Sequence, residues 1–80
     1  MPRHAGASHM PPDEVRYIRK VVLGWSIPEL ADALIDPYTG EPVSLSALNK
    51  WSSGANPVPL WVARRLRDLA EKAEIENKRT

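Results

Sequence analysis

Apolar residues recur at intervals of three and four after Pro12, which is the spacing of a helix with one buried face. Pro12 suits the first position of such a helix, and the acidic side chains of Asp13 and Glu14 complement its positive N-terminal end. The apolar stripe consists of Val15, Ile18, Val22 and Trp25. The pattern predicts a first helix that begins at Pro12 and ends at Gly24.

A capping box indicates the start of a second helix. The hydroxyl of Ser26 can accept a hydrogen bond from the backbone N–H of Glu29, whose carboxylate can accept one from the backbone N–H of Ser26. Trp25 and Leu30 have the spacing of the hydrophobic staple that accompanies such a box. We expect a short helix of about two to three turns, ended before Pro37.

A third helix is predicted over Leu45–Ser53. Ser44 can cap its N-terminus, and Gly54 supplies the left-handed residue that commonly ends a helix. Leu48 and Trp51 are three residues apart and therefore share the inward face of this helix.

Pro59 suits the first turn of a fourth helix. Its apolar stripe, again at intervals of three and four, consists of Val62, Leu66, Leu69 and Ala73. Asp68 and Lys72 are spaced as an ion pair on the helix surface. The helix is expected to fray after Ile75.

These elements predict an all-α domain of four, or at most five, helices that spans residues 10–76, with a frayed tail at 77–80. Residues 1–9 show no periodicity, and Ser8–Met10 has the form of a cloning scar before a natural start. We therefore interpret residues 1–9 as an expression-tag remnant. A core of about 70 residues supplies roughly 3 to 5 kcal/mol of net stability, so self-association is expected.

Charge is distributed unevenly along the chain. The full sequence has 11 basic and 10 acidic residues; without residues 1–9, which contain Arg3, the counts are 10 and 10 and the formal net charge is 0. Total charge is therefore no argument for nucleic acid. Residues 42–67, however, contain no Asp or Glu and carry a local charge of +4 from Lys50, Arg64, Arg65 and Arg67.

Several classes of function are not expected. The chain has no Cys, and both histidines lie within residues 1–9, so a thiolate or imidazole metal site and nucleophilic catalysis lack their usual groups. Carboxylates are scattered along helices, and no Gly-rich phosphate loop is present. No apolar run approaches the roughly 20 residues of a bilayer span, and no secretory signal pattern is seen. We expect no enzyme, metal, cofactor or membrane association.

Two capped helices joined by a turn form a helix-turn-helix pattern. The segments Gly24–Ala31 and Val43–Gly54 resemble the lambda-repressor-like, or XRE-type, family of helix-turn-helix regulators, and the likeness covers residues 12 to about 70. Two features depart from that family. The turn at Asp36–Pro42 is longer than the usual few residues, and the first helix is one residue longer before Gly24.

The resemblance implies that the third helix reads bases in the DNA major groove. The base-reading positions of the family fall on Leu45, Ser46, Asn49 and Lys50. Asn pairs bidentately with adenine, Lys reaches guanine, Leu touches the thymine methyl group, and Ser is permissive. Phosphate contacts are expected at the start of the second helix and around the third, from Ser26, Ser44, Ser53 and Asn56.

The resemblance further implies a transcriptional regulator, most simply a repressor of phage, plasmid or prophage type. Such a protein would act as a homodimer on an inverted-repeat operator in double-stranded DNA, within the cytoplasm of a bacterium or phage-infected cell and associated with the nucleoid. No small-molecule effector is implied.

A second interpretation stays open for each of these positions. Polar residues on the third helix can form a solvated face, and the two serines before the helices can act as caps only. Arg64 and Arg65 can add a basic flank for DNA or be ordinary surface residues. Trp61 can close the core or anchor a second subunit, and Tyr38 can lie in a wing toward DNA or at a partner-binding tip. A protein-interaction module or antitoxin-like protein that uses the 36–43 loop and Trp61 is the alternative function.

Overall fold

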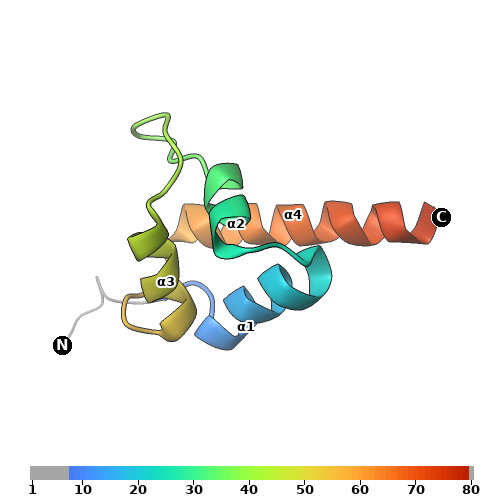
Figure 1. Cartoon of the computed structure of the whole chain (residues 1–80), viewed down its shortest axis with the longest axis horizontal. Coiled ribbons are helices and arrows are strands. Elements are labelled where there is room, and N and C mark those ends of the chain that lie inside the picture. Colours follow the sequence, from blue (N-terminus) through green and yellow to red (C-terminus); the bar gives the residue numbers. More distant parts are fainter. Residues whose placement is uncertain (1–7, 80) are drawn as a thin grey trace.

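The computed structural model describes residues 8–79. Figure 1 shows the longest helix as a rod along the long axis of the molecule, with the others packed along one side of it and its C-terminal end projecting beyond them. The helices in chain order are α1 (Pro12–Tyr17), η2 (Ile18–Leu23), α2 (Ile27–Ala33), α3 (Leu45–Ser53) and α4 (Leu60–Arg79). η2 continues α1 without a break, so the prediction of an all-α fold with four helices is confirmed for the described residues.

The local signals for helix ends are confirmed. Ser26 and Glu29 form the reciprocal hydrogen bonds of a capping box, from the Ser26 N–H to Glu29 Oε1 at 2.8 Å and from the Glu29 N–H to Ser26 Oγ at 3.3 Å. Gly24 and Gly54 both adopt left-handed backbone angles at the ends of η2 and α3. Glycine fits these positions because it has no Cβ to clash with the backbone.

The second half of the first helix differs from the prediction. Residues 18–23 form π-helical turns rather than α-helical ones. In a π-helix residues five apart point in similar directions, so Leu23 joins Ile18 against the core although it lies outside the predicted stripe. The last turn is held by Arg19, whose guanidinium donates to the Trp25 carbonyl at 2.8 Å and whose own carbonyl accepts the Trp25 N–H at 2.9 Å.

The predicted fraying after Ile75 is wrong, because α4 continues to Arg79. This segment contains no Gly or Pro and is rich in Ala, Glu and Lys, which are good helix formers. Within residues 8–79, no helix combines the length and the apolar character that crossing a membrane requires.

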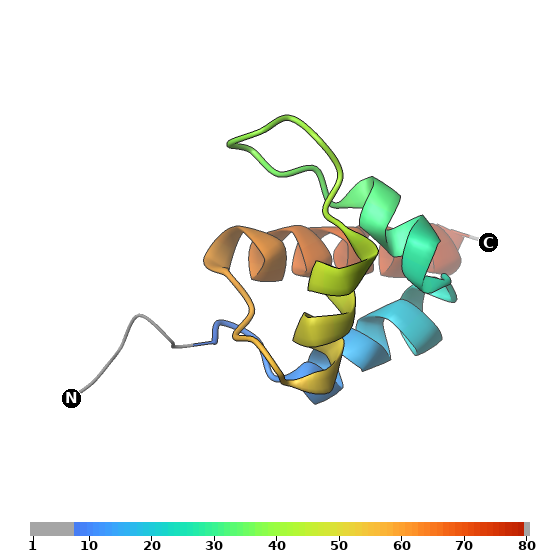
Figure 2. The same cartoon turned by 60° about the vertical axis from the view of Figure 1, so that its left-hand side comes forward.

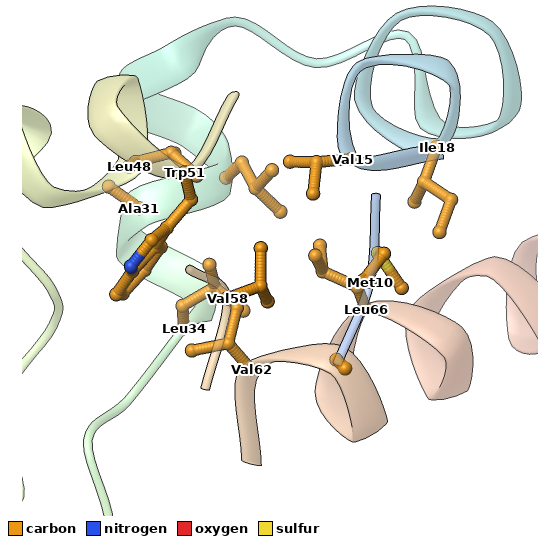
Figure 3. Close-up of a cluster of buried hydrophobic side chains, with 12 residues drawn as sticks. Met10, Val15, Ile18, Ala31, Leu34, Leu48, Trp51, Val58, Val62 and Leu66 are labelled. Carbon is orange, nitrogen blue, oxygen red and sulfur yellow. The ribbon is translucent and has the colours of Figure 1, made fainter. Parts of the chain in front are cut away.

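One hydrophobic core joins all the helices (Figure 3). Its fully buried large side chains are Met10, Val15, Leu30, Leu34, Leu48, Val58, Val62 and Leu66. The chain before α1 takes part in this packing. Val58 receives a hydrogen bond from the His9 N–H to its carbonyl at 3.0 Å and donates its own N–H to Ser8 Oγ at 2.9 Å. Ser8 and His9 therefore lie against the domain, whereas the other residues of the interpreted tag remnant lie outside the described part.

The long turn between α2 and α3 is a small hairpin. A single antiparallel bridge joins Ile35 to Pro42, and backbone hydrogen bonds run from Asp36 N–H to Glu41 O at 2.9 Å and from Val43 N–H to Leu34 O at 3.0 Å. We refer to residues 35–42 as the 35–42 hairpin. Figure 1 shows it extending away from the helices next to α2 and α3.

Replacing Gly54 with Ala should destabilise the protein more than replacing Gly40 with Ala. Both glycines have positive φ angles, of 86° and 75°, where a Cβ costs about 1 to 2 kcal/mol. A Cβ at Gly54 would also lie 3.1 Å from Pro12 Cγ, whereas one at Gly40 meets nothing within 4 Å. Urea denaturation of both variants measures the difference. A Pro12→Ala change should reduce the extra loss at Gly54; equal losses at the two glycines would contradict the contact.

Candidate nucleic-acid interface

α3 is fixed by contacts along its inner side and at both ends. Leu48 is fully buried and Trp51 is 9% exposed, and α3 packs against α1 and α2. At the N-terminus the Ala47 N–H donates to Ser44 Oγ at 3.0 Å. At the other end the guanidinium of Arg16, on α1, donates to the carbonyl of Ser52. The helix is therefore a rigid element attached on one side only.

The outer side of α3 is exposed. Ser46, Asn49 and Lys50 are exposed there, as the sequence predicts. Leu45, three residues before Leu48 and therefore partly on the same side of the helix, is 49% exposed. The side chains of these four residues form no hydrogen bond or ion pair with any part of residues 8–79. An amide, an ammonium group, a hydroxyl and an aliphatic group are thus available on one face of a fixed helix.

The four residues predicted to contact phosphates differ in whether their side chains already form hydrogen bonds within the protein. The hydroxyls of Ser26 and Ser44 accept backbone hydrogen bonds as helix caps, so the capping interpretation is confirmed for both. Ser53 Oγ donates to the Lys50 carbonyl at 3.3 Å. Asn56 is exposed and its side chain has no partner among the described residues, which leaves it the most available of the four.

The carboxylate of Glu29 lies at the N-terminus of α2, next to Ser26. Hydrogen bonds from Ser26, first from its backbone N–H and then from its side chain, lower the pKa of Glu29 below its ordinary value of 4.5. The group is therefore negatively charged at neutral pH. A negative charge at this position opposes a phosphate, so we rank the contact at Ser26 below those around α3.

The local charge of +4 in residues 42–67 is partly neutralised by acidic side chains that lie outside this segment in the sequence but close to it in the fold. Arg67 pairs with Glu14 at 3.4 Å, and Arg65 pairs with Asp68 at 2.9 Å and reaches the Ala33 carbonyl at 3.4 Å. Arg65 therefore connects α4 to the end of α2. Of the four cations only Lys50 and Arg64 have no partner within residues 8–79, and both are exposed.

The two aromatic candidates have different environments. Trp61 is half-buried and packs against the core, so it closes the core at least in part. Tyr38 is 88% exposed in the 35–42 hairpin. Neither side chain lies on the outer face of α3.

Sequence reasoning missed the role of Arg16. Its partner Ser52 is 36 residues away, and its spacing from Asp13 indicates only a surface ion pair within α1. No local sequence pattern predicts a hydrogen bond from an arginine side chain to a backbone carbonyl at the end of a distant helix. Among the described residues, no three His, Cys, Asp or Glu side chains gather as a metal site.

No family model, curated protein or solved structure compared with this chain matches it.

Replacing Glu29 with Gln should lower stability at neutral pH and have less effect in acid. A carboxyl whose pKa is lower in the folded state stabilises the fold above its unfolded pKa, here 4.5, and loses this contribution as the pH falls through the folded pKa. Gln keeps the capping-box geometry but does not titrate. Urea denaturation of both proteins between pH 7 and pH 3 measures the difference; a difference independent of pH would contradict this role.

Proposed function

We propose that this protein is a sequence-specific double-stranded DNA-binding protein that regulates transcription, with α3 as the recognition helix. The observation that supports this most directly is the two-sided character of α3. Its inner side is buried through Leu48 and Trp51, and its outer side presents unpaired polar groups to solvent. This is the arrangement by which a helix-turn-helix protein presents side chains to base edges.

The size and chemistry of the outer face fit a major groove. An α-helix with its side chains is about 10 to 12 Å in diameter, and the major groove is about 12 Å wide, so α3, nine residues long, can lie in it. Asn49 can form paired hydrogen bonds with adenine, and Lys50 can donate to guanine O6 or N7. Leu45 and Ser46, near the N-terminus of α3, add a methyl contact and a permissive hydroxyl.

The electrostatics support a moderate rather than a strong attraction to DNA. Lys50 and Arg64 are unpaired cations, and α3 itself contains no acidic residue. The full chain has a formal net charge of only +1. Because non-specific affinity comes from neutralised phosphates, specificity must depend largely on the base contacts of α3.

We further propose that the protein acts as a homodimer, and most simply as a repressor in the cytoplasm of a bacterium or phage-infected cell, bound to the nucleoid. A single α3 reads only a few base pairs. Two copies related by a two-fold axis would place their recognition helices in successive major grooves about 34 Å apart on an inverted repeat. This function is binding, without a chemical step.

Asn49→Ala and Lys50→Ala should each weaken binding to the preferred site by about 1 to 3 kcal/mol while leaving stability within about 0.5 kcal/mol. The preferred site is first identified by selection from a pool of random duplexes, to which the DNA upstream of the protein's own gene is added as a candidate. Fluorescence anisotropy then measures affinity at several salt concentrations. Lys20→Ala is the matched control, because Lys20 is an exposed cation on η2. Unchanged affinity in both α3 variants would overturn the assignment.

The preferred site should contain two half-sites and bind two protomers. Native mass measurement of the complex gives this ratio directly. Inserting about 5 base pairs between the half-sites rotates one by half a helical turn and should reduce binding by at least tenfold, whereas about 10 added base pairs should restore alignment of the two grooves. A complex of one protomer per duplex, insensitive to the insertion, would show that the protein acts as a monomer.

A further inference from the structure

A groove beside α3 lies outside the predicted base-contacting face, although Ser44, a predicted phosphate contact, is among its lining residues. It lies between the 35–42 hairpin, one side of α3 and the beginning of α4, and its volume is about 380 Å³. Figure 2 shows the hairpin and the first turns of α4 on the same side of α3. The apolar part of its lining consists of Pro42, Val43, Ala47, Trp51, Pro59 and Trp61. None of the four predicted base-contacting residues lines it.

Both tryptophans in the groove have an unused hydrogen-bond donor. The indole N–H groups of Trp51 and Trp61 donate to no acceptor within residues 8–79. Figure 3 shows the indole nitrogen of Trp51 at the edge of the core cluster, on the side away from Met10 and Ile18. Indole N–H groups in partly buried positions usually find an acceptor. A ligand that presents carbonyl oxygens would supply one.

The rim of the groove is acidic. Asp36 and Glu41, both in the hairpin, line it, and neither carboxylate pairs with a cation in the described part of the chain. The hairpin contains no Lys or Arg. This charge repels phosphate and attracts Arg or Lys, so the groove is unsuited to a DNA backbone.

The hairpin is longer than its connecting role requires, and it is ordered by its own hydrogen bonds. Helix-turn-helix elements are usually joined by about three to four residues. Here the Gly40 N–H donates to the Asp36 carbonyl at 2.7 Å, and the Tyr38 N–H donates to Asp36 Oδ1 at 2.7 Å. These hydrogen bonds fix the backbone of the hairpin, which carries the groove residues Asp36 and Glu41, and a preformed backbone lowers the entropic cost of binding a partner.

We propose that this groove binds an extended, proline-containing segment of a partner protein that carries Arg or Lys beside its prolines. A polyproline II segment has free carbonyl groups for the indole donors, and its proline rings pack well against aromatic and proline side chains. Its cationic residues meet Asp36 and Glu41. The four predicted base-contacting residues do not line the groove, so a segment bound there leaves them exposed and competes with DNA only at Ser44.

Isothermal titration with three blocked nonapeptides tests this proposal. The first has two prolines three residues apart followed by two arginines, the second replaces the arginines with glutamates, and the third replaces the prolines with glycines. We expect the first to bind with a Kd below 1 mM, and the other two to bind at least tenfold more weakly. Binding of none, or equal binding of all three, overturns the proposal.

Variants of the protein locate the binding site. Trp61→Ala should abolish binding of the arginine peptide, and Asp36→Asn with Glu41→Gln should weaken it about tenfold. Leu60→Ala is the matched control, since Leu60 is exposed beside Trp61 but does not line the groove. Trp61→Phe, which keeps an aromatic ring but removes the N–H, covers the case in which the alanine variant fails to fold. Unchanged peptide binding in both Trp61→Phe and the double amide variant would overturn the assignment of this groove as the binding site.

The same experiments give different results if the groove is occupied by DNA or by a second copy of the protein. If the groove instead faces DNA, the double amide variant will bind duplex DNA more tightly and no peptide will bind. If a second copy occupies it, Trp61→Phe will lower the solution mass. Either result overturns the proposal, and peptide binding that persists in Asn49→Ala separates it from the proposed reading of DNA.

Discussion

The burial of one side of α3 is the constraint on which the rest of this molecule depends. Leu48 and Trp51 belong to the core, α3 packs against α1 and α2, and Arg16 adds a polar contact at the C-terminal end. Because these contacts bury the inner side, the opposite side of the helix faces solvent. The exposure of Asn49 and Lys50 is therefore a consequence of the packing of the opposite side of α3 in the core, and it leaves their side chains free to contact a ligand.

The same constraint separates two surfaces of opposite character. The outer side of α3 carries a free cation and neutral polar groups, whereas the groove beside it is apolar with an acidic rim. Trp51 contributes to both the core and the groove wall, so a single indole connects the two regions. A helix of nine residues can thus serve two ligands of different chemistry.

Features with a local cause were predictable from the sequence. Ser26, Ser44 and Gly54 fix helix ends through hydrogen bonds or backbone angles a few residues away, and the observed bounds of α3 match the predicted ones. Features that depend on distant partners were not. Arg67 pairs with Glu14, which is 53 residues away. In residues 18–23, apolar residues stand both four and five positions after Ile18, so the sequence does not distinguish π-helical from α-helical turns. The exposed face of α3 was predictable, but the groove was not, because three separate elements form it.

Contacts between the beginning and the end of the chain also determine when the domain can form. Met10 and Val15 are buried together with Val62 and Leu66, and Arg67 reaches both the His9 carbonyl and Glu14. During synthesis the first three helices leave the ribosome before the helix that covers their apolar side chains exists. The apolar side chains of the earlier helices therefore stay uncovered until α4 has been made, and α3 can reach its packed position only after that.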